Sequence, residues 1–372
     1  MSTSKKLLTG VAAVLLLLSC GIKKSYAVGL DGGDWKFGVN GFLDLEYSGM
    51  DKAPMITHPG EVMTKTDDMS SFDQHINLLV NAARDRTSVT INLEGLHDYT
   101  GEGQNGIAIE EGYGVYSFSD TLKLHAGLML APFGIYNATR YITPLFASVV
   151  LPQMYQMPSN YHLEDISVNS TIMPYKANLM ISGTFSTDSA DFDYYLYMSN
   201  GENELESAHV GSDTNNDKGY GGRVRVAFAD DYLLGASYWT VNNSPADVGR
   251  ENLIGLDTEL NFSEELKLEI EYVADNYGVR KERHSYYARL TREMSNKISP
   301  FIAYDFAHDD SDDVYNRGQT RYSVGFGYRL SSFTTLKAGY HYHVLGDKNK
   351  APALPDGSDT FGMIKAAVIF VF

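Results

Sequence analysis

The sequence predicts an all-β protein, a transmembrane antiparallel β-barrel of about 16 strands, from three observations. Apolar and polar residues alternate with a period of two along most of the chain. The connections between the alternating segments are short and long in turn, as periplasmic turns and external loops would be. The chain ends on an aromatic residue, Phe372, after apolar residues at every second position. These features are typical of proteins that cross a membrane with strands.

The alternation gives each segment one apolar and one polar face. In 320–330, for example, Tyr322 and Val324 alternate with Arg321 and Ser323. Successive side chains of a strand point to opposite faces, and in a membrane barrel the apolar face meets lipid while the polar face lines the lumen. The predicted strands are 34–48, 71–84, 86–98, 106–118, 121–131, 176–186, 191–200, 219–228, 233–242, 251–262, 266–276, 284–294, 298–306, 320–330, 333–345 and 360–372.

The connections set the orientation of the barrel. Short turns such as Asp85 alternate with long polar connections such as 49–70 and 201–218. Membrane barrels have short periplasmic turns and long external loops, so an even number of strands places both barrel ends on the periplasmic side. The stretch 162–175 is ambiguous, because it fits either an additional strand or the upper end of the sixth.

The first 27 residues read as a signal peptide, which leaves 28–372 for the barrel. Lys5 and Lys6 precede a short apolar stretch, 7–18, and Ser25-Tyr26-Ala27 has the form of a cleavage site after Ala27. Two alternatives stay open. The apolar stretch could remain as a membrane anchor, or Cys20 could be lipidated within a sequence that resembles a lipobox.

The charge of the chain excludes some partners. The chain has 30 basic and 47 acidic residues and a net charge of -17. The first 27 residues hold four lysines and no acidic residue, so the remainder carries a net charge of -21. This balance argues against nucleic acid or anionic lipid as a partner. Because Cys20 is the only cysteine, a chain cleaved after Ala27 has neither disulfides nor thiol catalysis.

A soluble β-sandwich or soluble barrel is the rival fold, because alternation alone does not say which face meets water. The signal peptide, the unequal connections and the aromatic end of the chain favour the membrane barrel.

Several segments resemble the phosphate-selective porin O/P-like superfamily and the related β-barrel porin family of Gram-negative outer membranes. They are 122–137 (LKLHAGLMLAPFGIYN), 193–201 (DYYLYMSNG), 216–223 (NDKGYGGR) and 234–238 (LGASY). The resemblance is patchy, but it extends over roughly 34–372. It implies a 16-strand barrel that is often trimeric. Phosphate selectivity is not carried over, because it relies on a basic path and this chain is strongly acidic.

We therefore expect an outer-membrane porin-like channel for passive diffusion of small hydrophilic solutes or ions, with a weak preference for cations and neutral solutes. The connection 132–165 is long but rich in aromatic and apolar residues, and it is the candidate constriction loop. An ordinary external loop, or a plug in a closed barrel, is the alternative. The pore-lining candidates are Lys123, Arg140, Arg223, Arg225, Glu269, Glu271, Arg289, Asp305, Arg321, Arg329 and Lys337. Opposed rows of these charges would create a field across the pore, or would simply neutralise one another on neighbouring strands.

Other motifs point to no enzyme, cofactor or metal. His341 and His343 share a strand face but lack an evident third ligand, and 213–217 resembles a calcium loop without its glycine or its closing glutamate. The letters G-x-G-x-x-G in 101–106 are not followed by a helix. A lipase-type membrane enzyme would need a Ser/His pair that no spacing suggests.

The expected partners follow from the membrane setting. They are outer-membrane lipid and lipopolysaccharide, small hydrophilic solutes, the barrel-assembly machinery through Phe372, and two further copies in a homotrimer. The alternative function is a surface adhesin or receptor whose pore is closed.

Overall fold

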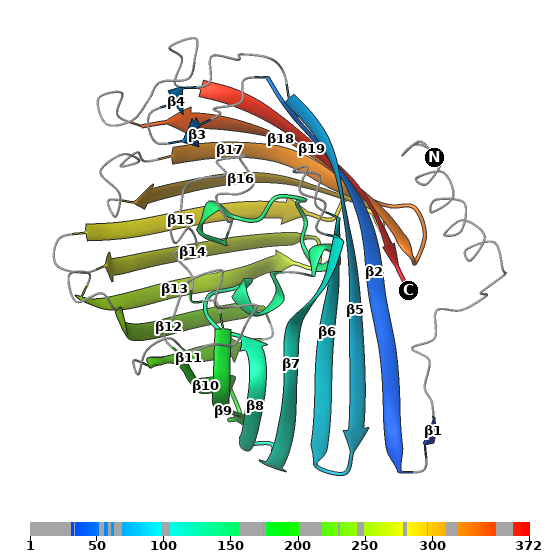
Figure 1. The fold of residues 1–372 in the computed structure, drawn as a ribbon, viewed down its shortest axis with the longest axis vertical. Coiled ribbons are helices and arrows are strands. Elements are labelled where there is room, and N and C mark those ends of the chain that lie inside the picture. Colours follow the sequence, from blue (N-terminus) through cyan, green and yellow to red (C-terminus); the bar gives the residue numbers. More distant parts are fainter. Residues whose placement is uncertain are drawn as a thin grey trace.

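The computed structural model is a closed antiparallel β-barrel (Figure 1). It describes residues 31–346 and 360–372 apart from 33, 52–55, 59–60, 63–68, 98–104, 141, 156–173, 175, 201–217, 230, 244–248, 278–280, 296 and 310–318. The predicted signal peptide, the stretch 162–175 except Pro174, and the acidic segment 213–217 therefore lie outside the described residues.

Sixteen strands form the wall, each paired with its two neighbours. They are β2 (Trp35–Met50), β5 (Met69–Arg84), β6 (Thr87–His97), β7 (Asn105–Ser119), β8 (Leu122–Leu130), β9 (Lys176–Ser186), β10 (Ala190–Ser199), β11 (Gly219–Phe228), β12 (Tyr232–Asn243), β13 (Gly249–Ser263), β14 (Leu266–Tyr277), β15 (Lys281–Arg292), β16 (Ile298–Asp309), β17 (Gln319–Arg329), β18 (Thr334–Leu345) and β19 (Thr360–Val371). The two-residue β1 (Asp31–Gly32) pairs with β2, and β3 (Ile56–His58) pairs with β4 (Glu61–Val62).

Pairing between the last and first long strands closes the barrel. β19 runs antiparallel to β2, from Met363 opposite Met50 to Val371 opposite Phe42. Phe372 extends the ladder, because its N–H donates to the Gly41 carbonyl and its carbonyl accepts from the Gly41 N–H. A closed ladder satisfies the backbone groups within the wall, as a strand in hydrocarbon requires. No helix in the described part of the chain is long and apolar enough to span a membrane.

The two faces of the wall differ as the alternation predicted. On β11, Val224 is 49% exposed on the outer face, whereas its neighbour Arg223 is buried on the inner face. The outer face carries apolar residues on every long strand of the second half, such as Leu256 and Ile302. The outer face of the wall is therefore the apolar face that the alternation predicted.

All sixteen predicted strands are present, and their ends agree with the observed ends within three residues. Strands are predictable here because each must present a continuous apolar face to lipid. Apolar residues therefore recur at every second position of the sequence. Phe42 breaks the alternation of β2, and the structure gives the reason. It points inward and packs with Ala367 and Ile369, and Ile142 and Val149 pack against this group.

Residues 131–155 leave β8 and fold into the barrel (Figure 1). We name this segment, without the undescribed residue 141, the lumenal lobe. It contains three 3-10 turns: η1 (Asn137–Thr139), η2 (Thr143–Leu145) and η3 (Gln153–Tyr155). Its apolar side chains form the main buried cluster of the protein with residues of the wall, which are Ala177, Met180, Tyr197, Trp239, Val241, Leu253, Val273 and Tyr287. The described part of the candidate constriction loop therefore lies in the lumen.

Gly127 lies where the pairing of β8 with β9 is irregular, and we predict that Gly127→Ala destabilises the barrel. Its φ of +132° is poorly suited to a side chain, and an added Cβ would lie 2.3 Å from the Gly112 carbonyl oxygen. Strain and overpacking together should cost about 2–5 kcal/mol. Urea unfolding of the refolded protein, followed by tryptophan fluorescence, measures the loss.

Gly38→Ala is the matched control, because nothing lies within 4 Å of a Cβ at that position. Its midpoint should stay near that of the wild type. Equal midpoints for Gly127→Ala and Gly38→Ala would contradict the assignment of Gly127 as a strained position.

Candidate functional site

The lumenal lobe begins with a close approach to the wall. Gly134 N–H donates to Ser237 Oγ at 3.3 Å, and Ile135 N–H donates to Glu271 Oε2 at 3.4 Å. Gly134 has a φ of +63°, and a Cβ there would lie 1.8 Å from Glu271 Oε1. Only glycine allows this backbone to reach the carboxylate, which explains the Pro-Phe-Gly sequence that follows β8.

Tyr155 ties the end of the described lobe to the same carboxylate. Its hydroxyl donates to Glu271 at 2.7 and 2.6 Å and accepts from the Tyr136 N–H at 3.1 Å. Burial, together with the negative charge of Glu271, raises the pKa of Tyr155 well above its usual range. The hydroxyl therefore stays protonated and remains a donor at alkaline pH. The Tyr136 hydroxyl donates to Glu269, one pleat along β14.

Basic side chains of β17 and β18, on the same arc as β14, donate to carbonyl groups of the lobe. Lys337 Nζ donates to the Thr143 carbonyl at 2.6 Å and also to the Phe146 carbonyl. Arg321 Nη2 donates to the Leu151 carbonyl at 2.6 Å. A short irregular segment has few internal backbone hydrogen bonds, so cations of the wall satisfy its buried acceptors.

The same wall contains ion pairs between its strands. Arg223 lies 2.8 Å from Asp257, Arg321 lies 2.8 Å from Asp305, and Arg289 lies 2.6 Å from Glu269. The Arg223–Asp257 pair crosses β12 at Gly235, where a Cβ would lie 2.4 Å from both Asp257 oxygens. These contacts show mutual neutralisation on this arc, one of the two arrangements that the sequence left open.

The pore-lining candidates thus separate into two groups. In the first group the side chain has a partner. Arg223 pairs with Asp257, and Arg140, which belongs to the lobe, donates to Asn137 at 3.2 Å. The wall residues that contact the lobe are Glu269, Glu271, Arg289, Asp305, Arg321 and Lys337. The side chains of Lys123, Arg225 and Arg329 make no hydrogen bond or ion pair with another described residue. Lys123 and Arg225 are half-buried, whereas Arg329 is exposed.

A cavity of about 290 Å³ lies between the lobe and the short-turn ends of β14 to β18. Basic residues dominate its lining: Lys267, Arg289, Lys297, Arg329 and Lys337 face Glu269 and Glu293 there. The lobe contributes Tyr136 and 144–147 to the same cavity. It is therefore a basic vestibule on the side of the short turns.

The wall formed by β2, β6 and β7 is acidic instead. Asp44, Glu46, Glu94 and Glu110 are buried there. Glu46 lies 3.3 Å from Lys365, and Glu110 lies 3.4 Å from Lys176. The lumen therefore has an acidic arc and a basic vestibule, a segregation that no single strand of the sequence reveals.

The histidines of the lumen have different surroundings. His341 Nδ1 lies 2.8 Å from Ser323 Oγ, and the His343 ring stacks on Phe361 at 4.4 Å. The histidine that meets carboxylates is His75, which lies opposite Asp44. The sequence did not single it out, because this contact depends on the register between β2 and β5.

These features define a class: a sixteen-strand outer-membrane barrel channel in which the third of the long connections, between β8 and β9, folds inward. The Gram-negative porin family model matches residues 99–348, more than half of the chain, and the chain belongs to this family. The family and the fold place it in the bacterial outer membrane as a channel for small solutes. No curated protein matches the sequence.

Solved structures of porins share the fold at low sequence identity. The anion-selective porin of Comamonas acidovorans is 12% identical, with a TM-score of 0.61 over 91% of this chain and 100% of that chain. The outer-membrane channel DcaP of Acinetobacter baumannii is 10% identical, with a TM-score of 0.59 over 94% and 100%. OmpF of Salmonella typhi, in complex with daunomycin, is 11% identical, with a TM-score of 0.60 over 91% and 98%. At these identities the similarity shows the fold.

We predict that Tyr155→Phe loosens the lobe without unfolding the barrel. The change leaves the Glu271 carboxylate and the Tyr136 N–H without the hydroxyl, which should cost about 1–3 kcal/mol. Limited proteolysis of the refolded protein should show faster cleavage within 132–165. Tyr238→Phe, which removes an exposed hydroxyl bonded to Asn252 on the outer face, is the control. Identical cleavage of the two variants would mean that Tyr155 does not hold the lobe.

Proposed function

We propose that the chain is a passive diffusion channel whose lumen is narrowed by the lumenal lobe and which weakly prefers cations and neutral solutes. The observation that carries this proposal is the seating of the lobe inside the wall through Glu271, Arg321 and Lys337. A segment bonded to several strands by buried polar contacts is a fixed constriction rather than a free loop.

The charge arrangement supports the direction of the preference. Lys337 and Arg321 donate to lobe carbonyls, and Arg321 and Arg289 are also paired with carboxylates. On the acidic arc, the buried side chain of Glu94 makes no hydrogen bond or ion pair with another described residue. The whole chain has a net charge of -17, which favours cations at the mouths of the pore.

We also propose that the first 27 residues act as an export signal cleaved after Ala27, which leaves the barrel at 28–372. Three copies assemble into a trimer, lipopolysaccharide surrounds the outer rim, and the assembly machinery reads the strand that ends at Phe372. The family and the fold indicate a channel without catalysis, and we assign no catalytic residue and no cofactor.

Single-channel recording of the refolded protein in a planar bilayer tests the proposal. We expect stable open steps and, under a salt gradient, a reversal potential that indicates cation selectivity. Open steps with anion selectivity would show that the basic vestibule outweighs the acidic arc. A folded barrel without conductance would contradict the channel and favour an adhesin or receptor.

We predict opposite shifts of selectivity for Arg329→Gln and Glu94→Gln. A unit charge about 8 Å from a passing ion in water contributes about 0.5 kcal/mol, or about a twofold change in relative permeability. Arg329→Gln should raise the cation-to-anion permeability ratio by about that factor, and Glu94→Gln should lower it by about that factor. Arg86→Gln, which alters an exposed residue at the turn after β5, should leave the ratio unchanged. Shifts in the same direction for the two lumen variants would contradict the charge assignment.

A further inference from the structure

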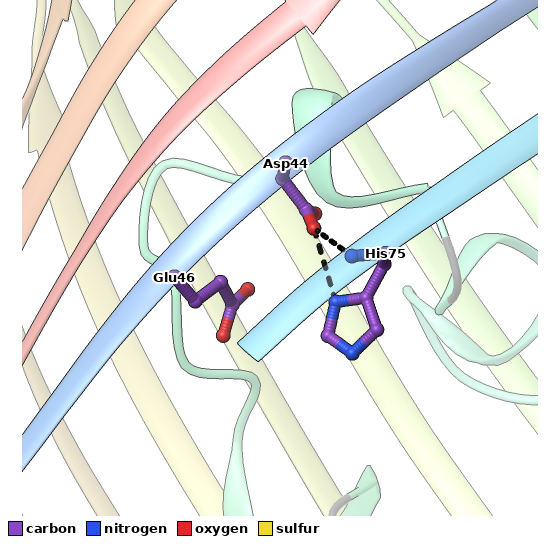
Figure 2. Close-up of side chains that lie close together, drawn as sticks. All are labelled: Asp44, Glu46 and His75. Atoms are coloured by element: carbon purple, nitrogen blue, oxygen red, sulfur yellow. Dashed lines mark hydrogen bonds and ion pairs between the residues drawn. The ribbon is translucent and has the colours of Figure 1, made fainter. Parts of the chain in front are cut away.

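Three potential metal ligands meet on the inner face of the acidic arc. Asp44 and Glu46 project from β2, and His75 projects from β5 toward them (Figure 2). Each residue offers one ligand atom, and these atoms lie within 4.8 Å of one another. His75 Nδ1 is 3.0 Å from Asp44 Oδ1.

We propose that Asp44, Glu46 and His75 bind a divalent transition-metal ion, such as Mn²⁺ or Zn²⁺, inside the lumen. One imidazole with two carboxylates is a donor set that these ions accept, whereas Ca²⁺ and Mg²⁺ prefer oxygen ligands alone. The two strands hold Asp44 and His75 as direct cross-strand partners, so their spacing is fixed by backbone pairing.

The spacing suits one shared ion. Two ligands at about 2.1 Å from a metal are about 3.0 Å apart at the right angle of octahedral coordination, and about 3.4 Å apart at the tetrahedral angle that zinc adopts. The 3.0 Å between His75 Nδ1 and Asp44 Oδ1 matches the octahedral value. The third ligand atom, from the Glu46 carboxylate, lies within 4.8 Å of the other two.

A second observation beside the cluster points to a missing partner. Asn77 follows His75 by two residues on the same inner face and is 1% exposed. Neither atom of its amide has a hydrogen-bond partner among the described residues. Buried amides are ordinarily bonded, so a ligand atom or a water held by an ion is the expected partner here.

Further buried carboxylates lie beside the cluster. Glu94 pairs in register with Asn77 across β5 and β6, is 7% exposed, and lies within electrostatic range of His75. Asp44 and Glu46 are buried as well, and Glu46 lies 3.3 Å from Lys365. A divalent cation between the Asp44 and Glu46 carboxylates would be attracted by their charge.

Binding would also reach the constriction. Asp44 Oδ2 accepts from Thr143 Oγ1 of the lumenal lobe at 2.5 Å, so a metal ligand is bonded directly to the lobe. An ion at this position would neutralise part of the acidic arc. On the proposed channel function, a bound ion would therefore lower cation selectivity.

The rival interpretation is a protonated His75 paired with Asp44, with no metal. Equilibrium dialysis distinguishes the two. Protein refolded after treatment with a chelator is dialysed against Mn²⁺ or Zn²⁺, and bound metal is measured by mass spectrometry. We expect the wild type to bind about one ion per chain. His75→Ala should bind the ion with an affinity at least tenfold weaker than that of the wild type.

His125→Asn is the matched control, because His125 also faces the lumen but bonds Ser182 at 2.8 Å, away from the cluster. It should bind as the wild type does. No binding by the wild type, or equal binding by His75→Ala and the wild type, would overturn the proposal.

If His75→Ala fails to fold, wild-type crystals soaked in Mn²⁺ decide the question. An anomalous scattering peak about 2.0–2.3 Å from His75 Nδ1 is expected, and its absence while the crystals carry Mn²⁺ elsewhere would overturn the site. Both measurements are independent of conductance, so a closed pore would refute the channel and leave the metal site to be judged separately.

Discussion

The closed hydrogen-bond ladder is the constraint on which the rest of the structure depends. Within hydrocarbon each backbone N–H and C=O needs an internal partner, and a sheet without free edges supplies it. Closure is completed where β19 meets β2, in a register that continues to Phe372 and Gly41. Once the wall is closed, every strand must turn one row of side chains outward and the other inward. The side chains of the inner row are the ones that can form a binding site in the lumen.

The inner row also creates a problem, because many of its side chains are charged and buried. The lumenal lobe and the wall resolve it together. Lobe N–H and O–H groups donate to wall carboxylates such as Glu271, and wall cations such as Lys337 donate to lobe carbonyls. The lobe and the wall thus supply hydrogen-bond partners for each other's buried polar groups. The lobe is consequently part of the packed interior of the barrel, although by sequence it is a connection between two strands.

Charge is distributed unevenly around this interior. The arc near β14 to β18 neutralises its charges through ion pairs and lobe contacts, while its short-turn end opens into a basic vestibule. The acidic arc, which carries Asp44 and Glu46 on β2, Glu94 on β6 and Glu110 on β7, keeps buried carboxylates near His75 of β5. The proposed selectivity and the proposed metal site both derive from that difference. An ion held there would lie against the lobe through Asp44 and Thr143.

The sequence by itself determined the sixteen strands and the two faces of the wall, and it pointed to 132–165 as the candidate constriction loop. It could do so because contact with lipid forces a period of two on each strand, and because a long connection rich in aromatic residues has to bury them somewhere. It identified Arg223, Glu269 and Arg321 as lumen residues for the same reason. The tertiary structure decided which of them meet. The contact between His75 and Asp44 depends on strand register, and the bonds from Tyr155 to Glu271 and from Lys337 to Phe146 join residues 116 and 191 positions apart. The periodicity of the sequence predicts whether a side chain points to lipid or to the lumen. Which residue it contacts is decided only when the barrel closes and brings distant strands together.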